Sequence, residues 1–240
     1  MGVFKKILPP REMALQDFIE QKFEAFKEQA PNLRKDPFTF AIYSYYNGLK
    51  YKDIKRPGIL TIIDYELVST RPRMFILDLE NEKVLYSGYV AHGEKSGGNK
   101  FVYWSNKDGS NATPIGFFIT GEDYEKGKRM KLDGLEEGVN DLSRDPRGII
   151  VHGAWYVSDE FIKEYGRLGR SDGCPAVKEE DAKFVINTIK DGTAFFIYYP
   201  DSDYLSTSRY TKRKTAEEKF TEIQKKGRDI ITDTKLSQSY

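Results

Sequence analysis

Ser171-Asp172-Gly173-Cys174-Pro175, with Val151-His152-Gly153 upstream of it, is the most informative part of this chain. Cys174 is the only cysteine among the 240 residues, and His152 is one of two histidines. A cysteine in a glycine-containing turn, preceded by a histidine at the end of an apolar strand, is the smallest set that a thiol nucleophile and its base require. The pattern therefore predicts covalent acyl chemistry on Cys174, with His152 as the base.

The glycines beside these two residues predict how each is presented. Gly173 allows the backbone before Cys174 to adopt a conformation that a Cβ would hinder. Such a turn directs the N–H groups of Gly173 and Cys174 to one point, which predicts an oxyanion hole. Ser171 is expected to hold the loop by hydrogen bonding back to it. His152 ends a predicted strand, and Gly153 permits a bend directly after it.

Other kinds of site fit these residues less well. Cys174 and His152 also fit a small buried cysteine and a structural histidine. Together with His92 they would form a zinc site, but the short spacing that zinc ligands usually show is absent. A serine enzyme of the penicillin-binding type requires Ser-x-x-Lys, which the chain lacks.

Composition and charge narrow the classes of function. The 38 basic and 37 acidic residues leave a formal net charge of +1, which argues against a dedicated nucleic-acid binder. No stretch approaches the roughly 18 apolar residues of a membrane span, and Met1–Pro10 lacks the apolar core of a secretory signal. Aromatic residues make up 14% of the chain. Surfaces rich in tyrosine often line grooves for peptides or sugars, although tyrosines of the core and its rim are commoner.

Hydrophobic periodicity predicts a mainly β chain with helices added at both ends. The predicted helices are 11–30, 37–51, 179–190 and 214–228. The predicted strands are 59–64, 74–79, 84–91, 116–120, 128–132, 149–152 and 193–199. The helix over 37–51 contains many β-forming residues, and the polar tail after 228 is expected to be disordered. The expected division is an N-terminal helical extension over 1–57, a mainly β domain over 58–200 and a C-terminal helical or disordered extension over 201–240.

These motifs resemble the signature of the L,D-transpeptidase catalytic domain, the YkuD-like family, in which a histidine precedes a Ser/Thr-x-Gly-Cys turn. The similarity is greatest to a subgroup of murein L,D-transpeptidase domains. It covers residues 58–200, so the resemblance implies that these residues form the catalytic domain. The further stretches that carry the resemblance are Thr113-Pro114-Ile115-Gly116-Phe117-Phe118, Phe75-Ile76-Leu77-Asp78-Leu79, Val90-Ala91-His92-Gly93, Gly134-Leu135-Glu136 and Gly169-Arg170-Ser171-Asp172-Gly173-Cys174-Pro175-Ala176.

The resemblance implies a mainly β, sandwich-like fold of the YkuD type and a cysteine acyltransferase that acts on peptidoglycan. The Cys174 thiolate would attack the carbonyl at the L-centre of diaminopimelate in a tetrapeptide stem and release D-Ala. His152 would transfer protons, oriented by the Gly153 carbonyl, and the N–H groups of Gly173 and Cys174 would stabilise the oxyanion. An amine of a neighbouring stem would then take the acyl group.

Four further residues are expected to contact the substrate. His92 ends another predicted strand and either faces the cleft or supports its loop. Trp104 is expected on a neighbouring loop wall, and Ser171 and Arg170 directly precede the catalytic turn. Many family members place an arginine or asparagine two residues after the cysteine, where this chain has Ala176. Arg170, or else Arg167, is expected to take over that contact.

No cofactor and no metal is expected, and the expected partners are peptidoglycan stem peptides. A carbapenem is expected to add covalently to Cys174. Because peptidoglycan lies outside the inner membrane, the implied location is the periplasm or cell envelope, with an export signal that this chain does not carry. The sequence leaves open whether water takes the acyl group, as in an L,D-carboxypeptidase or amidase, or whether the chain is a non-catalytic peptidoglycan-binding module. It also leaves open the acceptor, the oligomeric state, the role of the N-terminal helices and whether Met1-Gly2 is the native start.

Overall fold

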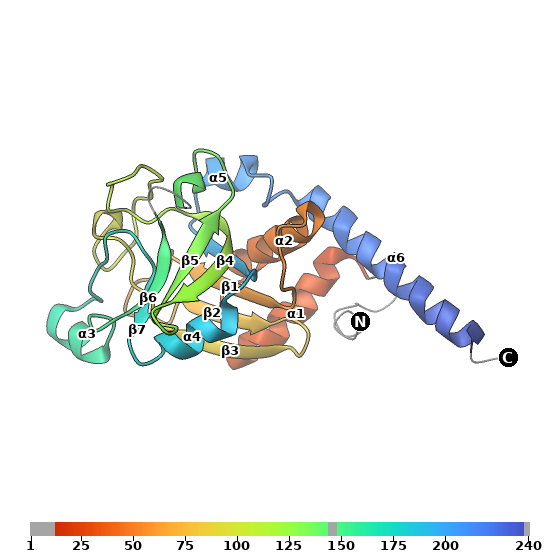
Figure 1. Ribbon diagram of the computed structural model, residues 1–240, viewed down its shortest axis with the longest axis horizontal. Coiled ribbons are helices and arrows are strands. Elements are labelled where there is room, and N and C mark those ends of the chain that lie inside the picture. The colour runs from red at the N-terminus through yellow and green to blue at the C-terminus, as the bar shows by residue number, and fades with distance from the viewer. Residues whose placement is uncertain (1–12, 144–147, 238–240) are drawn as a thin grey trace.

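An eight-stranded sheet forms the centre of the structure, a computed structural model that describes residues 13–143 and 148–237 (Figure 1). The order across the sheet is β3-β2-β1-β8-β4-β5-β6-β7. β1 pairs with β8, and β6 with β7, in parallel, whereas the other neighbours are antiparallel. The strands are β1 (Ile59–Asp64), β2 (Met74–Asp78), β3 (Lys83–Gly88), β4 (Gly116–Tyr124), β5 (Arg129–Gly134), β6 (Ile150–Ala154), β7 (Ala176–Lys178) and β8 (Ala194–Tyr198).

The sheet is nearly closed into a barrel because the chain beyond one edge strand returns to the other. After β3 the backbone continues to Ala91, which forms an antiparallel bridge with Ala176 of β7. These two residues exchange backbone hydrogen bonds of 2.8 and 3.3 Å. The curled sheet encloses one hydrophobic core to which all eight strands contribute. The expected mainly β fold with helices at both ends is confirmed.

The middle strands of the sheet are buried on both faces. Every residue of β8, Ala-Phe-Phe-Ile-Tyr, is buried, and such unbroken apolar runs are typical of strands that are covered on both sides. Successive side chains of a strand point to opposite faces of the sheet. In each of the pairs Phe117–Phe118 and Phe195–Phe196, one ring therefore packs on one face and the other ring on the opposite face. All four rings are fully buried, and each contributes roughly 1.5–3 kcal/mol relative to an exposed ring.

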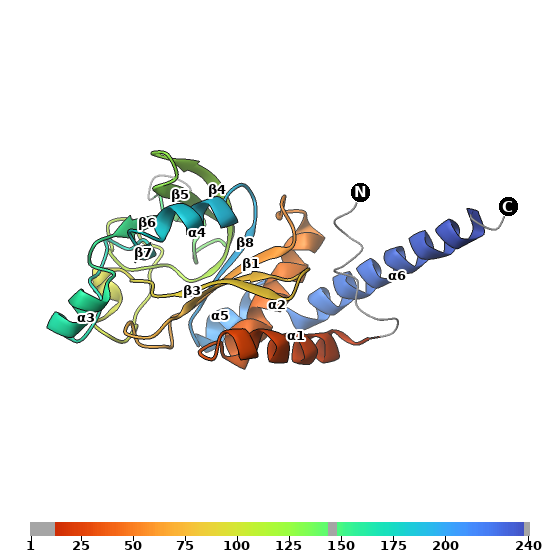
Figure 2. The same ribbon diagram turned by 90° about the horizontal axis from the view of Figure 1, so that it is seen from below.

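Helices from the two ends of the chain pack against one another beside the sheet (Figures 1 and 2). Phe18, Tyr46 and Phe220 join α1, α2 and α6, with ring centroids 5.2–6.1 Å apart. α2 also contacts β1 and β8, whereas the far end of α6 runs out from the body (Figure 2). The helices are α1 (Leu15–Gln29), α2 (Lys35–Tyr51), α3 (Asp159–Tyr165), α4 (Ala182–Ile189), α5 (Ser202–Thr207) and α6 (Arg213–Ser237).

Most of the predicted elements are confirmed, and the differences have local causes. α2 forms despite its β-forming residues because most of its side chains are buried against the sheet and its neighbouring helices. The strand predicted over 84–91 ends at Gly88, where pairing with β2 ends. The expected disorder after residue 228 is wrong as far as Ser237, because α6 continues to that residue. The expectations for Met1–Pro10 lie outside the described residues.

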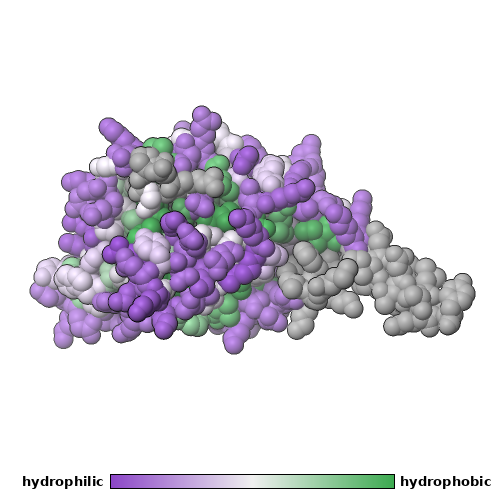
Figure 3. All heavy atoms as spheres, viewed as in Figure 1, coloured by the Kyte–Doolittle hydropathy of each residue, from purple (hydrophilic) through white to green (hydrophobic). Residues whose placement is uncertain are grey.

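Most of the surface seen in Figure 3 is hydrophilic, and hydrophobic atoms show mainly in the middle of the view, over the sheet. In the described parts of the chain, no helix combines the length and the apolar character that crossing a bilayer requires.

Candidate active site

The pairing of β6 with β7 brings His152 and Cys174 into one cleft. The two strands are parallel, with His152 opposite Ala176, and the His152 N–H donates to the Pro175 carbonyl at 3.3 Å. Cys174 directly precedes this pairing, so it lies beside the strand that carries His152. Both residues line a hollow of about 330 Å³, which we call the cleft. The backbone hydrogen bonds between β6 and β7 therefore set the positions of His152 and Cys174 relative to each other.

Ser171 holds the turn that presents Cys174. Its Oγ donates to the Cys174 carbonyl at 2.6 Å and accepts from the Gly173 N–H at 3.1 Å. Gly173 has a φ of 122°, a conformation that side chains with a Cβ rarely adopt. The turn is thus built as the sequence indicates, with one difference for the predicted oxyanion hole. The Gly173 N–H already binds Ser171 Oγ, so an oxyanion there has to displace this hydroxyl.

The segment after β3 supports the turn that presents Cys174 through Gly93. Gly93 forms a parallel bridge with Ser171, and its N–H donates to Thr113 Oγ1 at 2.9 Å. A Cβ at position 93 would lie 2.7 Å from Gly173 Cα and 2.5 Å from the Asn111 carbonyl oxygen. Only a residue without a side chain therefore lets this backbone approach the turn so closely.

The ring of His152 is oriented by the next residue in the chain. Its Nδ1 lies 3.1 Å from the Gly153 carbonyl oxygen. Because a carbonyl only accepts, Nδ1 carries the hydrogen and Nε2 keeps its lone pair. Burial lowers the pKa of His152, and Arg129 adds to this, while the Gly153 carbonyl and Asp172 oppose it. The net lowering leaves a neutral imidazole at pH 7, with one nitrogen able to accept a proton.

Arg129 and Tyr156 also line the cleft, and sequence reasoning missed both. Arg129 is directly opposite His152 in the antiparallel pairing of β5 with β6, so the two side chains share a face of the sheet. Tyr156 follows β6, and burial, together with Cys174 and Asp172, raises the pKa of its hydroxyl to about 12. Only the register of β5 on β6 would have identified Arg129, and one sequence does not give that register.

Arg170 lines the cleft, and its expected contact with the substrate stays a prediction. Its Nη1 donates to the backbone carbonyls of Glu94 at 3.3 Å and Gly97 at 3.2 Å. These bonds hold an exposed guanidinium next to the turn that presents Cys174, and its other N–H groups remain as possible donors to a ligand. Arg167, the other candidate, lines a hollow beside the cleft that Arg170 also borders.

His92 does not line the cleft and is only 1% exposed. Its Nδ1 lies 2.8 Å from Arg73 Nη2, a fully buried guanidinium that also donates to the Val90 carbonyl. Burial and the positive charge of Arg73 lower the pKa of His92 to about 3. The backbone carbonyl of His92 accepts from the Ser171 N–H at 3.0 Å. The predicted substrate contact by this ring is therefore corrected to the loop-supporting alternative.

Trp104 does not line the cleft with Cys174 and His152. Its Nε1 donates to Asp201 Oδ2 at 2.8 Å, the residue that caps the N-terminus of α5. Trp104 is partly buried against the core and is not among the residues that line the cleft. The expected position on the cleft wall is wrong, because the loop of Trp104 packs towards the C-terminal helices.

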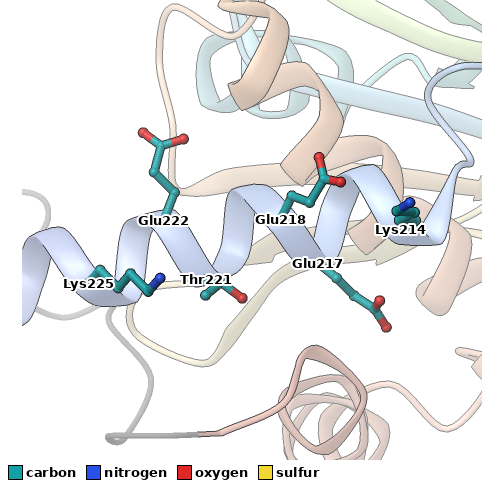
Figure 4. A pocket seen from close by; sticks show the side chains of 6 residues that line it. All are labelled: Lys214, Glu217, Glu218, Thr221, Glu222 and Lys225. Carbon is teal, nitrogen blue, oxygen red and sulfur yellow. The ribbon is translucent and has the colours of Figure 1, made fainter.

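The described residues offer neither a second candidate site along α6 nor a metal site. A hollow of about 510 Å³ runs along α6, but it is lined only by lysine, glutamate and threonine side chains of that helix, and these point in different directions (Figure 4). Within 13–143 and 148–237, no three His, Cys, Asp or Glu side chains gather as ligands of a metal ion.

The fold and the cleft define a mainly β domain in which a cysteine and a histidine, brought together by two neighbouring strands, line one hollow. The chain belongs to the L,D-transpeptidase catalytic domain family, whose model matches residues 29–198. The match begins at Gln29 and thus includes α2, which the expected division placed in the N-terminal extension; that division remains a prediction. No curated protein matches the chain in sequence.

Three solved structures resemble the fold at low identity. One is described as LD transpeptidase LdtMt1 in complex with imipenem (13% identity, TM-score 0.35, 59% of each chain). The second is an L,D-transpeptidase from Mycobacterium smegmatis (14%, 0.36, 59% of each chain). The third is the K307A mutant of the helical cell shape determining protein Pgp2 from Campylobacter jejuni (13%, 0.38, 66% of this chain and 57% of that one). The chain thus spans less than two thirds of each of these proteins.

Proposed function

We propose that this protein is a peptidoglycan L,D-transpeptidase that works through a thioester on Cys174. The observation that carries the proposal is the cleft shared by Cys174 and His152, with the Gly153 carbonyl on His152 Nδ1. Membership of the L,D-transpeptidase family supports the same reaction. The substrate is a tetrapeptide stem, cleaved between the L-centre of diaminopimelate and D-Ala.

In the first half-reaction, Cys174 Sγ bonds to the carbonyl carbon while the thiol proton passes to His152 Nε2. The oxyanion accepts from the N–H of Cys174 and, once Ser171 Oγ moves aside, from that of Gly173. One such donor is worth about 3–4 kcal/mol in the transition state. The C–N bond to D-Ala then breaks, and His152 gives its proton to the leaving amine. The products are a thioester on Cys174 and free D-Ala.

In the second half-reaction, an amine of a neighbouring stem takes the acyl group. His152 and Arg129 also line a second hollow of about 490 Å³, so His152 is accessible from two directions. We place the acceptor amine in this second hollow. Its nitrogen attacks the thioester carbon, its proton passes through His152 to the Cys174 sulfur, and the thiol is restored. Water in the same position would give an L,D-carboxypeptidase.

The same cleft is proposed to take a carbapenem. A β-lactam carbonyl is an acyl donor for a thiol nucleophile. Ring opening by Cys174 Sγ would leave a stable acyl-enzyme, with the ring nitrogen taking the proton. Since the proposed substrate is peptidoglycan, the proposed location is the periplasm or cell envelope.

The products from purified disaccharide-tetrapeptides test the proposed function. We expect cross-linked dimers together with released D-Ala, as separated by chromatography and weighed by mass spectrometry. Tripeptides without dimers would instead establish the carboxypeptidase, because water would then be the acceptor. Binding of the stems with no product at all would leave only a non-catalytic module and would contradict the proposal.

Two substitutions at the cleft are expected to shift the pH profile in opposite directions. The base must be neutral, so kcat/KM rises with pH through the pKa of His152, which lies below the ordinary value of about 6.5. Asp172 raises this pKa and Arg129 lowers it. Asp172→Asn should therefore move the acidic limb to lower pH, and Arg129→Gln should move it to higher pH.

The measurement is kcat/KM between pH 4 and 8 at constant ionic strength, because these charges are partly screened by salt. Lys163→Gln, on the exposed helix α3, serves as a charge-removing control that leaves the limb in place. If both cleft variants shifted the limb in the same direction, or neither did, His152 would not be the group that titrates.

A further inference from the structure

An exposed group of aromatic side chains lies beside the cleft. Trp155 is 71% exposed and Tyr165 is 53% exposed, and Phe161 lies between them in the sequence. We call Trp155, Phe161 and Tyr165 the aromatic platform. At the left end of Figure 3, where α3 lies, pale atoms of near-neutral hydropathy stand among the hydrophilic ones. Contiguous exposed apolar groups often mark a binding surface.

The rings of the platform hold one another in place. Trp155 meets Phe161 with ring centroids 5.7 Å apart in an edge-to-face arrangement, and Phe161 meets Tyr165 at 4.4 Å. On its other side, Trp155 meets Tyr156 at 5.9 Å. None of the residues of α3 is buried, so packing of the fold does not account for these aromatics. A surface whose rings are already ordered pays less entropy on binding a ligand.

The platform is continuous with the cleft. A hollow of about 270 Å³ is lined by Trp155, Tyr156, Phe161 and Arg170, and the cleft is lined by Tyr156 and Arg170 as well. β6 carries His152, which lines the cleft, and the chain leads from this strand directly into the turn with Trp155, which lines the neighbouring hollow. A ligand that reacts at the cleft and is longer than the cleft can therefore extend onto the platform.

The charges around the platform restrict what it can bind. Glu94, Arg167 and Arg170 line the same hollow and offer both hydrogen-bond donors and acceptors. A sugar ring presents an apolar C–H face and a rim of hydroxyls, so it matches an exposed indole flanked by such groups. α3 also exposes three acidic residues, Asp159, Glu160 and Glu164, against one lysine, Lys163, so this helix offers no basic patch to an anionic membrane surface.

We infer that the aromatic platform binds a sugar ring of the glycan strand whose stem peptide enters the cleft. The inference rests on the proposed function for the identity of the reacting group. Trp155 supplies the stacking face, and Arg167 and Arg170 hydrogen bond to the ring substituents. The platform thereby selects stems that are still attached to glycan over free peptides.

Fluorescence tests the platform without any turnover. The chain has two tryptophans, and Trp104 is partly buried whereas Trp155 is exposed. Titration with peptide-free oligosaccharides of the peptidoglycan glycan should give a saturable blue shift in emission. The shift should persist in Trp104→Phe and disappear in Trp155→Ala. No shift up to millimolar sugar, or a shift with phosphatidylglycerol vesicles in place of sugar, would overturn the inference.

Kinetics separate this inference from the proposed function. Trp155→Ala should raise KM about tenfold for a disaccharide-tetrapeptide, with kcat unchanged, and leave the free tetrapeptide unaffected. Phe184→Ala is the matched control, because Phe184 on α4 is 54% exposed and does not line the platform hollow. An equal loss on both substrates would contradict the platform. A wild-type protein that turns over neither substrate would contradict the proposed function, while the sugar titration would still decide the platform.

Discussion

Replacing Cys174 by alanine is expected to abolish turnover of tetrapeptide stems while the protein remains folded. The chain has no second cysteine, so no other thiol can form the thioester. Loss of a catalytic nucleophile typically lowers kcat by a factor on the order of 10⁴ or more. The side chain is only partly buried, and alanine removes a single sulfur atom, so the melting temperature should change little. A coupled assay that detects released D-Ala measures the loss of turnover.

The far-UV circular dichroism spectrum and the melting curve of Cys174→Ala serve as the control for folding. A folded variant with wild-type rates of D-Ala release would rule out the cysteine mechanism. It would favour a site in which the cleft positions water without covalent catalysis.

Gly93→Ala is expected to lower kcat/KM on the order of a hundredfold, although position 93 touches neither reacting atom. The backbone at Gly93 (φ −65°, ψ 146°) suits any residue, so the cost is steric alone. The added methyl group would lie 2.7 Å from Gly173 Cα and must push the turn that carries Cys174. A displacement of about 1 Å at a catalytic group is enough for such a loss.

Gly98→Ala is the matched control for this substitution. Gly98 lies in the same connection, and a Cβ there would meet nothing within 4 Å, so activity and stability should stay at wild-type levels. The two variants are compared by kcat/KM and by melting temperature. Equal activity in both would show that the approach of Gly93 does not fix the turn.

The sequence predicted the elements with strong periodicity and missed the short ones. α1, α2 and the long central strands have enough apolar residues at regular spacing to be recognised. β7 has only three residues, which is too few for any period, and it exists because it pairs with β6 and bridges to Ala91. α3 has a capping signal, since Ser158 Oγ accepts from the Phe161 N–H, but it has no buried stripe to reveal it.

In the candidate site, the sequence predicted the features that involve residues close together in the chain. The turn from Ser171 to Cys174 was predicted from its residues, and the contact of His152 with Gly153 was implied by the family resemblance. Both depend on residues that are close in the chain, and the structure contains both. His92 precedes a glycine just as His152 does, so the two histidines look alike in the sequence. What separates them is Arg73, which approaches His92 from another strand connection and is fully buried with it. Such partners come from the tertiary fold.

The intact mass of the protein, quenched during turnover of a tetrapeptide stem, tests the thioester most directly. The account predicts an added mass equal to the stem minus D-Ala, located on Cys174 by peptide mapping and absent from Cys174→Ala. Steady release of D-Ala with no adduct at any quench time, and with the alanine variant still active, would contradict it.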